Sequence, residues 1–347
     1  MSKKEKIAIV GASGYLGEEL IGLLLKHPGA DITCITSRQH HGKTLEEVFP
    51  TFAKCPEAKK IQFTSSDGSN IANSEARFAF LALPHGLATE FALPLFEAGV
   101  RVIDLSADFR IKDPLVYKEF YGTEHLATEL LQESVYGLPE RYREKISGAK
   151  LIACPGCYPT SILLPLLPLV QAGAINPQSI VATSLSGVSG AGRKLDTGYL
   201  YVECNDNARQ YGVPKHRHLA EIEQELSVAA NQRVMVNFTP ILAPLSRGIL
   251  TTIYAMPQPG ITEVDIARLY QPYLEQEPFI RILDQDHLPA IHHVARTNFI
   301  DIAFRLDPRT GRLVLMSAED NLTKGAAGQA IQNFNLMSGQ PETTGLL

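Results

Sequence analysis

The sequence predicts an α/β protein with two domains, and three observations lead to this prediction. The chain has 347 residues, of which 45% are hydrophobic, so it can bury a large core and form two domains. In the first half, short apolar strands alternate with helical patterns, which is typical of a parallel sheet covered on both faces. After about residue 154 the strand patterns are longer and richer in β-branched residues, and an antiparallel or mixed sheet fits them better.

The first predicted domain, residues 1–153, alternates strands and helices. Its apolar strands are expected at 7–10, 32–36, 78–83 and 100–105, and a helical pattern covers 15–26. The second predicted domain, residues 154–319, holds the longer strands, at 180–185, 234–242, 250–256, 299–306 and 313–317. Residues 324–337 return to helical spacing. We expect this closing helix, within 320–347, to pack back onto the first domain and complete it.

Composition argues against several classes of function. The net charge is −5, and the charged residues, 20% of the chain, are of mixed sign without a basic block, so no nucleic-acid surface is expected. The longest apolar run, 162–170, contains two prolines and is too short to span a membrane. Five cysteines without a secretory signal indicate free thiols in a reducing compartment. These observations predict a soluble, cytoplasmic protein.

A glycine-rich motif at 11–17 follows the first strand and opens the first helix, with glycines at i, i+3 and i+6. The first glycine permits a tight turn, the second lets a phosphate approach the backbone, and the third allows close packing of helix on strand. A glycine triplet alone is weak evidence, but its place at the start of a strand–helix–strand pattern favours a dinucleotide site. The expected cofactor contacts are Gly11, Ser13, Gly14, Tyr15, Leu16 and Gly17.

The end of the second strand indicates which dinucleotide binds. An NAD site usually places Asp or Glu there, to accept a hydrogen bond from the ribose 2′-hydroxyl. Here the strand ends with Thr36-Ser37-Arg38, and the hydroxyl of Ser37 and the guanidinium of Arg38 suit a 2′-phosphate. The sequence therefore predicts NADP, against the alternative that Arg38 is an ordinary exposed loop arginine.

The segment 152–160 carries the candidate nucleophile. A Pro-Gly turn precedes Cys157, and the apolar run behind it can wind into a helix. A thiol at a helix N-terminus faces unpaired backbone N–H groups and the positive end of the helix dipole, and both favour the thiolate. We therefore expect Cys157 to be a catalytic nucleophile.

The Cys154-Pro155-Gly156-Cys157 string has two other interpretations. A redox pair would need a thioredoxin-like context, and none is apparent in the sequence. A zinc site would need a second Cys or His pair, whereas the remaining cysteines occur singly, at Cys34, Cys55 and Cys204. We expect no metal site, and buried structural roles for these three cysteines.

A general base is expected from Lys215-His216-Arg217-His218, which places two imidazoles and two cations in four residues. The apolar spacing from Leu219 onward predicts a helix, so His218 lies at its N-terminus. The helix dipole there lowers the pKa of an imidazole and favours its neutral form, which can take the thiol proton and later return one. Glu221 is expected to cap this helix or to orient the ring. An isolated histidine near a helix start is usually structural, but two beside two cations favour proton transfer and anion binding.

Two further segments are candidate ligand sites. The glycine-rich stretch 186–194 follows a strand, and its backbone amides are expected to cradle a phosphate or line the nicotinamide, unless it is a flexible surface loop. Asp108-Phe109-Arg110 ends a strand of the first domain, where open α/β sheets bind ligands, so Arg110 is a candidate carboxylate clamp.

Taken together, these residues closely resemble the N-acetyl-gamma-glutamyl-phosphate reductase family over nearly the whole chain. The Pro-Gly-Cys-Tyr-Pro-Thr string at 155–160 is highly specific to that family. The other segments that carry the resemblance are 11–17, 83–86, 103–110, 186–193, 216–218 and 320–330.

The resemblance implies a Rossmann domain, an α+β catalytic domain like that of glyceraldehyde-3-phosphate dehydrogenase, and a homotetramer or homodimer. The family's catalytic cysteine falls on Cys157, and its His-x-His motif falls on His216 and His218; His218 is assigned as the base and His216 as the fallback. The family commonly has Asn where this chain has Cys154, which could form an off-pathway disulfide with Cys157. Further cofactor contacts are expected at Pro84, Ser186, Gly187, Ser189, Gly190 and Asn321, and substrate contacts at Arg110, Arg193 and Arg217.

The implied reaction belongs to arginine biosynthesis and is an NADPH-dependent reductive dephosphorylation of a small acyl phosphate, N-acetyl-glutamyl 5-phosphate. Cys157 attacks the acyl phosphate, phosphate leaves, and reduction of the thioester gives N-acetyl-glutamate 5-semialdehyde, with His218 moving protons. Three alternatives stay open. They are aspartate-semialdehyde dehydrogenase, whose sequence around the cysteine differs, a reductase of carrier-bound aminoadipyl phosphate in lysine synthesis, and a non-catalytic NADP sensor.

Overall fold

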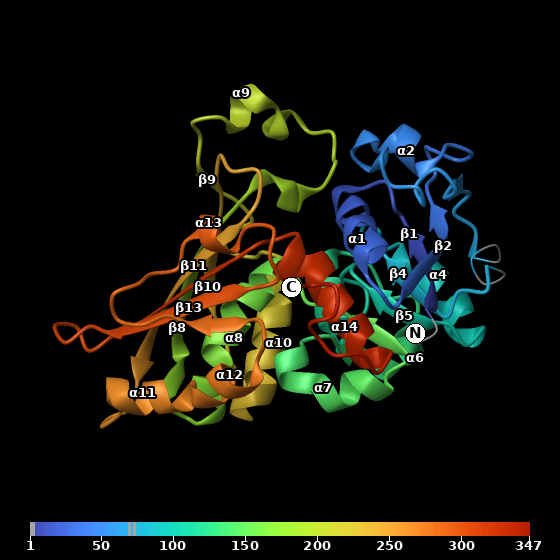
Figure 1. Ribbon diagram of the computed structural model, residues 1–347. Helices are drawn as coiled ribbons and strands as arrows, with labels where there is room; N and C mark the ends of the chain where they lie inside the picture. Colours follow the sequence, from blue (N-terminus) through green and yellow to red (C-terminus); the bar gives the residue numbers. More distant parts are fainter. Residues whose placement is uncertain (1–3, 69–70, 72–73) are drawn as a thin grey trace. The chain divides into compact units, whose positions relative to one another are not determined.

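The computed structural model describes residues 4–68, 71 and 74–347, and the chain forms two compact units (Figure 1). The first unit comprises Met1–Pro155 with Ala326–Leu347, and the second comprises Gly156–Gly325. Within the described residues, no helix is both long enough and apolar enough to cross a membrane.

The first unit is built on a seven-stranded sheet with the order β3-β2-β1-β4-β5-β7-β6, and its strand pairs are parallel. The strand order reverses between β1 and β4. Ligands of open α/β sheets bind outside the carboxyl ends of the strands at such a point. The strands are β1 (Glu5–Val10), β2 (Ala30–Thr36), β3 (Phe63–Thr64), β4 (Phe78–Leu81), β5 (Arg101–Asp104), β6 (Val135–Tyr136) and β7 (Leu151–Ala153).

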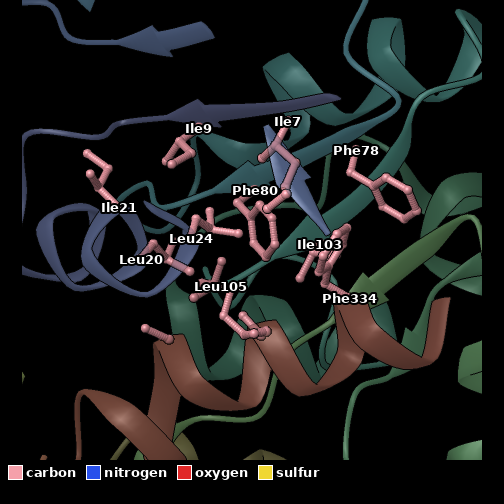
Figure 2. Close-up of a cluster of buried hydrophobic side chains, with 14 of the residues drawn as sticks. Ile7, Ile9, Leu20, Ile21, Leu24, Phe78, Phe80, Ile103, Leu105 and Phe334 are labelled. Atoms are coloured by element: carbon pink, nitrogen blue, oxygen red, sulfur yellow. The ribbon is translucent and has the colours of Figure 1, made fainter. Parts of the chain in front are cut away.

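Helices cover both faces of this sheet, because alternate residues of a strand point to opposite faces. Ile7 and Ile9 of β1 share one buried cluster with α1 (Tyr15–Lys26) and α14 (Gly328–Met337). Figure 2 shows this cluster, in which the rings of Phe80 and Phe334 lie 6.0 Å apart. The intervening residues of β1 belong to a second cluster with α4 (Ala88–Glu97). Further α-helices in the described part of this unit are α2 (Leu45–Val48), α5 (Pro114–Tyr121), α6 (Thr128–Glu133) and α7 (Pro139–Gly148).

The second unit is built on a seven-stranded mixed sheet with the order β12-β13-β14-β11-β8-β10-β9. Its strands are β8 (Ile175–Ser186), β9 (Arg209–Gln210), β10 (Asn237–Leu242), β11 (Ile249–Pro257), β12 (Ile280–Ile282), β13 (Ile300–Leu306) and β14 (Leu313–Glu319). Helix α8 (Cys157–Gln171) packs on this sheet and on α10 (His218–Ala230). The shorter helices are α9 (Tyr201–Cys204), α11 (Glu263–Leu269), α12 (Gln271–Gln276) and α13 (Ile291–Val294).

The predicted fold class is confirmed, with one parallel sheet and one mixed sheet. The second sheet is not wholly antiparallel, because β10 pairs with β8 and β12 with β13 in parallel. The strand predicted from residue 234 begins only at Asn237. Side chains of α10 bind the preceding amides: the N–H of Val234 donates to Ser227 Oγ, and the N–H of Val236 donates to Glu223 Oε1, each at 2.9 Å.

The closing helix differs from the predicted one at its start. The chain makes one π-helical turn at Thr323–Ala327 before α14 begins at Gly328. The π turn is wider than an α turn and often marks a functional site. Helix α14 then packs within the first unit, on α7, α1 and β5.

Candidate active site

Cys157 is the first residue of α8, directly after the N-cap residue Gly156. The N–H of Gly156 donates to Oε1 of Glu221 at 2.8 Å, and Glu221 is a fully buried residue of α10. Since α10 packs on α8, this hydrogen bond fixes the start of the helix that carries the thiol. Glu221 therefore stabilises the start of α8. The sequence instead predicted that it would cap its own helix or orient the imidazole.

The π turn lies against the half-buried Cys157. A Cβ atom added at Gly325 would lie 2.8 Å from Cys157 Cβ and 3.2 Å from Cys157 Cα. The same position is 2.9 Å from Oε1 of the fully buried Glu319. These distances leave no room for a side chain at residue 325, so the close approach of the turn to the nucleophile requires glycine.

The two predicted imidazoles lie together at the start of α10. The N–H of His218 donates to Nδ1 of His216 at 3.1 Å, and the two ring centroids are 4.9 Å apart. Tyr158, the neighbour of Cys157 in α8, lies edge-on to both imidazoles, at 5.5 Å from His216 and 5.9 Å from His218. Its hydroxyl is 2.8 Å from the hydroxyl of Tyr211. The residue that follows the nucleophile therefore packs directly on the histidine pair.

Burial affects the protonation of His216, and this distinguishes the roles of the two histidines. Burial, and then the positive charge of Arg217, lowers the pKa of His216 to about 4. His216 is therefore neutral at physiological pH, and its Nδ1 lone pair is used to position His218. Burial, and then the neighbouring Tyr211, raises the pKa of Tyr158, so this phenol stays protonated. His218 is consequently a better candidate for the base than His216.

The glycine-rich loop after β8 uses its first amides inside the second unit. The N–H groups of Gly187, Val188 and Ser189 donate to carbonyl oxygens of residues 248, 245 and 246 at 2.8–3.1 Å. These three amides are not available to cradle a phosphate, contrary to the expectation from sequence. The cofactor contacts expected at Ser186, Gly187, Ser189 and Gly190 stay a prediction.

Asn321 is buried and joins this loop to the neighbouring strand. Its Oδ1 accepts the N–H of Gly248 at 2.6 Å, and its Nδ2 donates to Ser189 Oγ at 3.0 Å. Its predicted contact with the cofactor is not tested by these hydrogen bonds. They do show that Asn321 holds the loop in place.

The predicted substrate arginines occupy different environments. Arg193 and Arg217 are exposed in the second unit. Arg110 is buried in the first unit, where its guanidinium donates to the carbonyl oxygen of Leu105 at 3.0 Å. Its neighbour Asp108 accepts the N–H groups of Gly86 and Ala88 at 2.7 and 2.9 Å, and so fixes the loop that follows Pro84.

The glycine motif of the first unit forms a tight cradle between β1 and α1. Gly11 has φ +78°, and a Cβ there would lie 2.5 Å from the carbonyl oxygen of Ala82, which follows β4. A Cβ at Gly17 would lie 2.4 Å from the carbonyl oxygen of Ala12, whereas a Cβ at Gly14 would meet its nearest neighbour only at 4.0 Å. The first and third glycines therefore serve packing, and the second leaves the backbone open to a ligand.

The residues predicted to select NADP follow this cradle. Ser37 is buried, and its Oγ lies 2.9 Å from Oγ of Ser13 in the glycine motif. The side chain of Arg38 is 64% exposed and lies 3.8 Å from the carboxylate of Glu90. This ion pair is weak because both partners are largely hydrated, so Arg38 can turn toward a phosphate at little cost.

All five cysteines lie within the described residues and are free thiols. Cys154, which directly follows β7, is buried, and Nδ2 of Asn333 lies 3.7 Å from its sulfur. Within the described residues, no group of three or more His, Cys, Asp or Glu side chains could hold a metal ion.

Sequence reasoning missed a buried ion pair between Arg247 and Asp320. Nε of Arg247 lies 2.8 Å from Oδ2 of Asp320, and the two side chains are 9% and 0% exposed. Asp320 begins a motif that the sequence singled out, but Arg247 stands in no motif, and a pairing over 73 residues leaves no spacing signal.

Two family models match the chain: "Semialdehyde dehydrogenase, NAD binding domain" over residues 6–149, and "Semialdehyde dehydrogenase, dimerisation domain" over residues 157–321. The N-acetyl-gamma-glutamyl-phosphate reductase of Akkermansia muciniphila is 53% identical, over 99% of this chain and 99% of that protein. The protein of the same name from Geotalea daltonii is 48% identical, over 98% of this chain and 97% of that protein.

Among solved structures, the crystal structure of aspartate semialdehyde dehydrogenase II from Vibrio cholerae, complexed with ASA, has a TM-score of 0.74. It covers 97% of this chain and 99% of its own, and it is 20% identical. At this identity the likeness concerns the fold.

Proposed function

Because the chain belongs to the N-acetyl-gamma-glutamyl-phosphate reductase family of semialdehyde dehydrogenases, we propose that it reduces N-acetyl-L-glutamyl 5-phosphate with NADPH in arginine biosynthesis. The products are N-acetyl-L-glutamate 5-semialdehyde and phosphate. The observation that carries the proposal is the position of Cys157 at the start of α8, where its neighbour Tyr158 packs on His216 and His218 at the start of α10. This arrangement supplies a nucleophile and a base for acyl transfer.

The first unit fits the cofactor. The cradle of Gly11, Gly14 and Gly17 leaves the backbone open at its second glycine, and the helix N-terminus behind it suits a pyrophosphate. Ser37 and Arg38 offer a hydroxyl and a guanidinium to a 2′-phosphate, which supports NADP. When bound, NADPH supplies the hydride that reduces the acyl group. We assign residues 1–153, with 320–347, to the NADP-binding domain and 154–319 to catalysis and oligomerisation.

In the proposed mechanism, Cys157 attacks the acyl carbon as a thiolate, and backbone N–H groups at the start of α8 stabilise the oxyanion. Collapse of this adduct expels phosphate and leaves a thioester on the sulfur. After reduction, the thiohemiacetal releases the aldehyde and regenerates the thiolate, while His218 first donates and then accepts the proton at the oxygen. Arg110, Arg193 and Arg217 are the proposed contacts for the substrate carboxylate and phosphate.

The protein oligomerises through its second domain, which matches a dimerisation domain. We propose a homodimer or homotetramer in which the open face of β8 and β11 is covered by another copy. Val181, Tyr254 and Met256 lie on that face and are each about two-fifths exposed. In sedimentation experiments, Tyr254→Arg should lower the mass, whereas Val264→Arg, on the outside of α11, should not. An unchanged mass for Tyr254→Arg would assign the interface to another surface.

Since all five thiols are free, we further propose a cytoplasmic location.

The assay that tests the function follows NADP⁺ reduction in the presence of phosphate, with N-acetyl-glutamate semialdehyde and aspartate semialdehyde offered in parallel. We expect phosphate-dependent turnover of the acetylated aldehyde and little with aspartate semialdehyde. Turnover of aspartate semialdehyde alone would assign the chain to the family with which it shares the fold. NADP binding without turnover of either would point to the carrier-bound aminoadipyl substrate or to a sensor.

A further inference from the structure

We propose that Asp320, through its ion pair with Arg247, is a positioning residue that holds two segments in place at the nucleophile Cys157. One segment is the π turn Thr323–Ala327, and the other is the glycine-rich loop after β8. The inference deepens the proposed function, on which it rests for the reaction. The contacts that carry it all lie within residues 156–325, the second unit, which includes the first three residues of the π turn.

The carboxylate of Asp320 is fully buried and accepts hydrogen bonds from three directions. Oδ1 accepts the N–H groups of Leu322 and Thr323, at 2.9 and 3.1 Å, which closes the chain onto itself directly before the π turn. Oδ1 also accepts from Arg247 at 3.0 Å. Oδ2 accepts the N–H of Arg296 at 2.6 Å, and Arg296 has a φ of +64°, which is uncommon for a residue other than glycine.

The backbone of Asp320 continues this contact to the nucleophile. Its carbonyl oxygen accepts the N–H of Gly325 at 2.9 Å. Gly325 is the residue whose Cβ would lie 2.8 Å from Cys157 Cβ. The position of Gly325 beside the thiol therefore depends on Asp320 in two ways. Its side chain holds the amides of Leu322 and Thr323, and its carbonyl oxygen holds the amide of Gly325.

Arg247 continues the contact to the other segment. Its guanidinium also donates to Thr323 Oγ1 at 3.3 Å, so it binds the first residue of the π turn. A Cβ at Gly187 would lie 2.7 Å from both N and Cα of Arg247, which shows that the loop packs directly on the arginine backbone. Asn321, the next residue after Asp320, binds the same loop through Ser189 Oγ.

This arrangement couples the charge of one carboxylate to the geometry of the site. In Asp320→Asn the volume is kept, but an amide NH₂ would face the donors of Arg247 and Arg296 in place of Oδ2. A buried arginine would also lose its counter-ion. We expect the π turn and the loop to shift, and a misplacement of about 1 Å near reacting groups costs roughly a hundredfold in rate.

The experiment compares Asp320→Asn with Asp301→Asn. Asp301, in β13 beside the strand that leads into Asp320, serves as the control, because it is also buried and pairs with an arginine, Arg281, at 2.5 Å. Four quantities are measured on each folded protein: kcat and KM for the acetylated aldehyde, the rate of Cys157 alkylation by iodoacetamide across pH, and the thermal midpoint. Alkylation is read for the Cys157 peptide by mass spectrometry.

We expect Asp320→Asn to lower kcat by roughly ten- to a hundredfold and to change the Cys157 alkylation rate at least about threefold. Asp301→Asn should lower the thermal midpoint without either effect. If Asp320→Asn and Asp301→Asn differ in neither kcat nor alkylation rate, Asp320 has only a structural role and the inference is wrong.

A second variant keeps the inference testable if Asp320→Asn does not fold. Arg247→Lys retains the positive charge but cannot reproduce the forked contact with Asp320 and Thr323. We expect Arg247→Lys to lower kcat less than Asp320→Asn does and to alter the rate of Cys157 alkylation. If kcat and the alkylation rate are both unchanged, the proposal is wrong. If the wild-type protein turns over neither aldehyde, the proposed function fails, while the alkylation comparison still tests the positioning role.

Discussion

Among single residues, Cys157 has the most direct test, because its thiol stands at the first position of α8 and in contact with the π turn. In Cys157→Ser the hydroxyl remains protonated at neutral pH, so it cannot replace the thiolate. We expect turnover to fall by at least roughly a thousandfold. NADP binding, measured by fluorescence titration, should be unchanged. Substantial residual turnover would remove Cys157 from the role of nucleophile.

The two histidines should respond differently to the same change. His218→Asn removes the proposed base and should lower kcat by roughly a hundred- to ten-thousandfold. His216 has a pKa of about 4 and positions His218 through one hydrogen bond, so His216→Asn should cost less in kcat. The pH–rate profile of each variant checks the assignment. If His216→Asn gives the larger loss, the fallback assignment is correct and the roles are reversed.

These residues could be predicted from the sequence where the interactions that position them are local in the chain, and not where the partners are far apart in sequence. Cys157 and His218 stand at helix starts, which turn residues and apolar spacing reveal within a few positions. The pairing of Glu221 with the N–H of Gly156 spans 65 residues, and no local pattern encodes it. The amides of the glycine-rich loop were expected to bind a ligand, yet those of residues 187–189 pair with carbonyl groups of residues 248, 245 and 246, a neighbouring segment that sequence spacing cannot show.

At the scale of an element, α1 offers a matched pair of glycines. Gly17→Ala would place a Cβ 2.4 Å from the carbonyl oxygen of Ala12, so the helix must move away from β1. At Gly22 the nearest atom, Cε1 of Phe52, is 3.7 Å away, which is an ordinary contact. We expect Gly17→Ala to weaken NADP binding and lower stability, while Gly22→Ala raises stability by up to about 1 kcal/mol.

Titration calorimetry and urea unfolding of both variants test this prediction. Equal NADP affinity in Gly17→Ala and the wild-type protein would mean that the close packing of α1 on β1 is not needed for the cofactor site.

Elements differed from the predictions mainly where they are short or irregular. Helix α1 has the predicted bounds, because its apolar periodicity runs over 12 residues. Strands β3, β6 and β9 have two residues each, which is too few for any periodicity to appear. The π turn at Thr323–Ala327 was predicted as regular helix, since its wider turn depends on contacts with Asp320 and Cys157 and leaves no sign in the local spacing.

At the scale of the whole molecule, the strand patterns of the sequence predicted the division into a parallel and a mixed sheet. They did not predict which charged side chains are buried in the two units. Asp104 ends β5 and is fully buried. Ser106 donates to both of its oxygens, through its N–H at 2.9 Å and its hydroxyl at 2.8 Å. Burial, and then the negative charge of Asp108, nevertheless raises the pKa of Asp104 to about 7, although Arg110 acts in the opposite direction.

This buried carboxyl should make the stability of the protein depend on pH. In the unfolded chain an aspartate titrates near pH 3.9, so between about pH 4 and pH 7 the folded protein retains a proton that the unfolded chain has lost. The contribution to stability is fully present below about pH 4 and is lost as the pH rises through about 7. Each unit of difference in pKa corresponds to about 1.4 kcal/mol, so the total is a few kcal/mol at most.

Asp104→Asn removes this titration while it keeps a side chain of similar shape that can still accept from Ser106. The midpoint of urea unfolding of the wild-type protein should therefore fall from about pH 5 to pH 8 more steeply than that of Asp104→Asn. Other titrating groups contribute equally to both proteins, so the difference between the two curves isolates the carboxyl. Parallel curves would mean that Asp104 is ionised throughout this range, with its charge stabilised by Ser106 and Arg110 more strongly than burial opposes it.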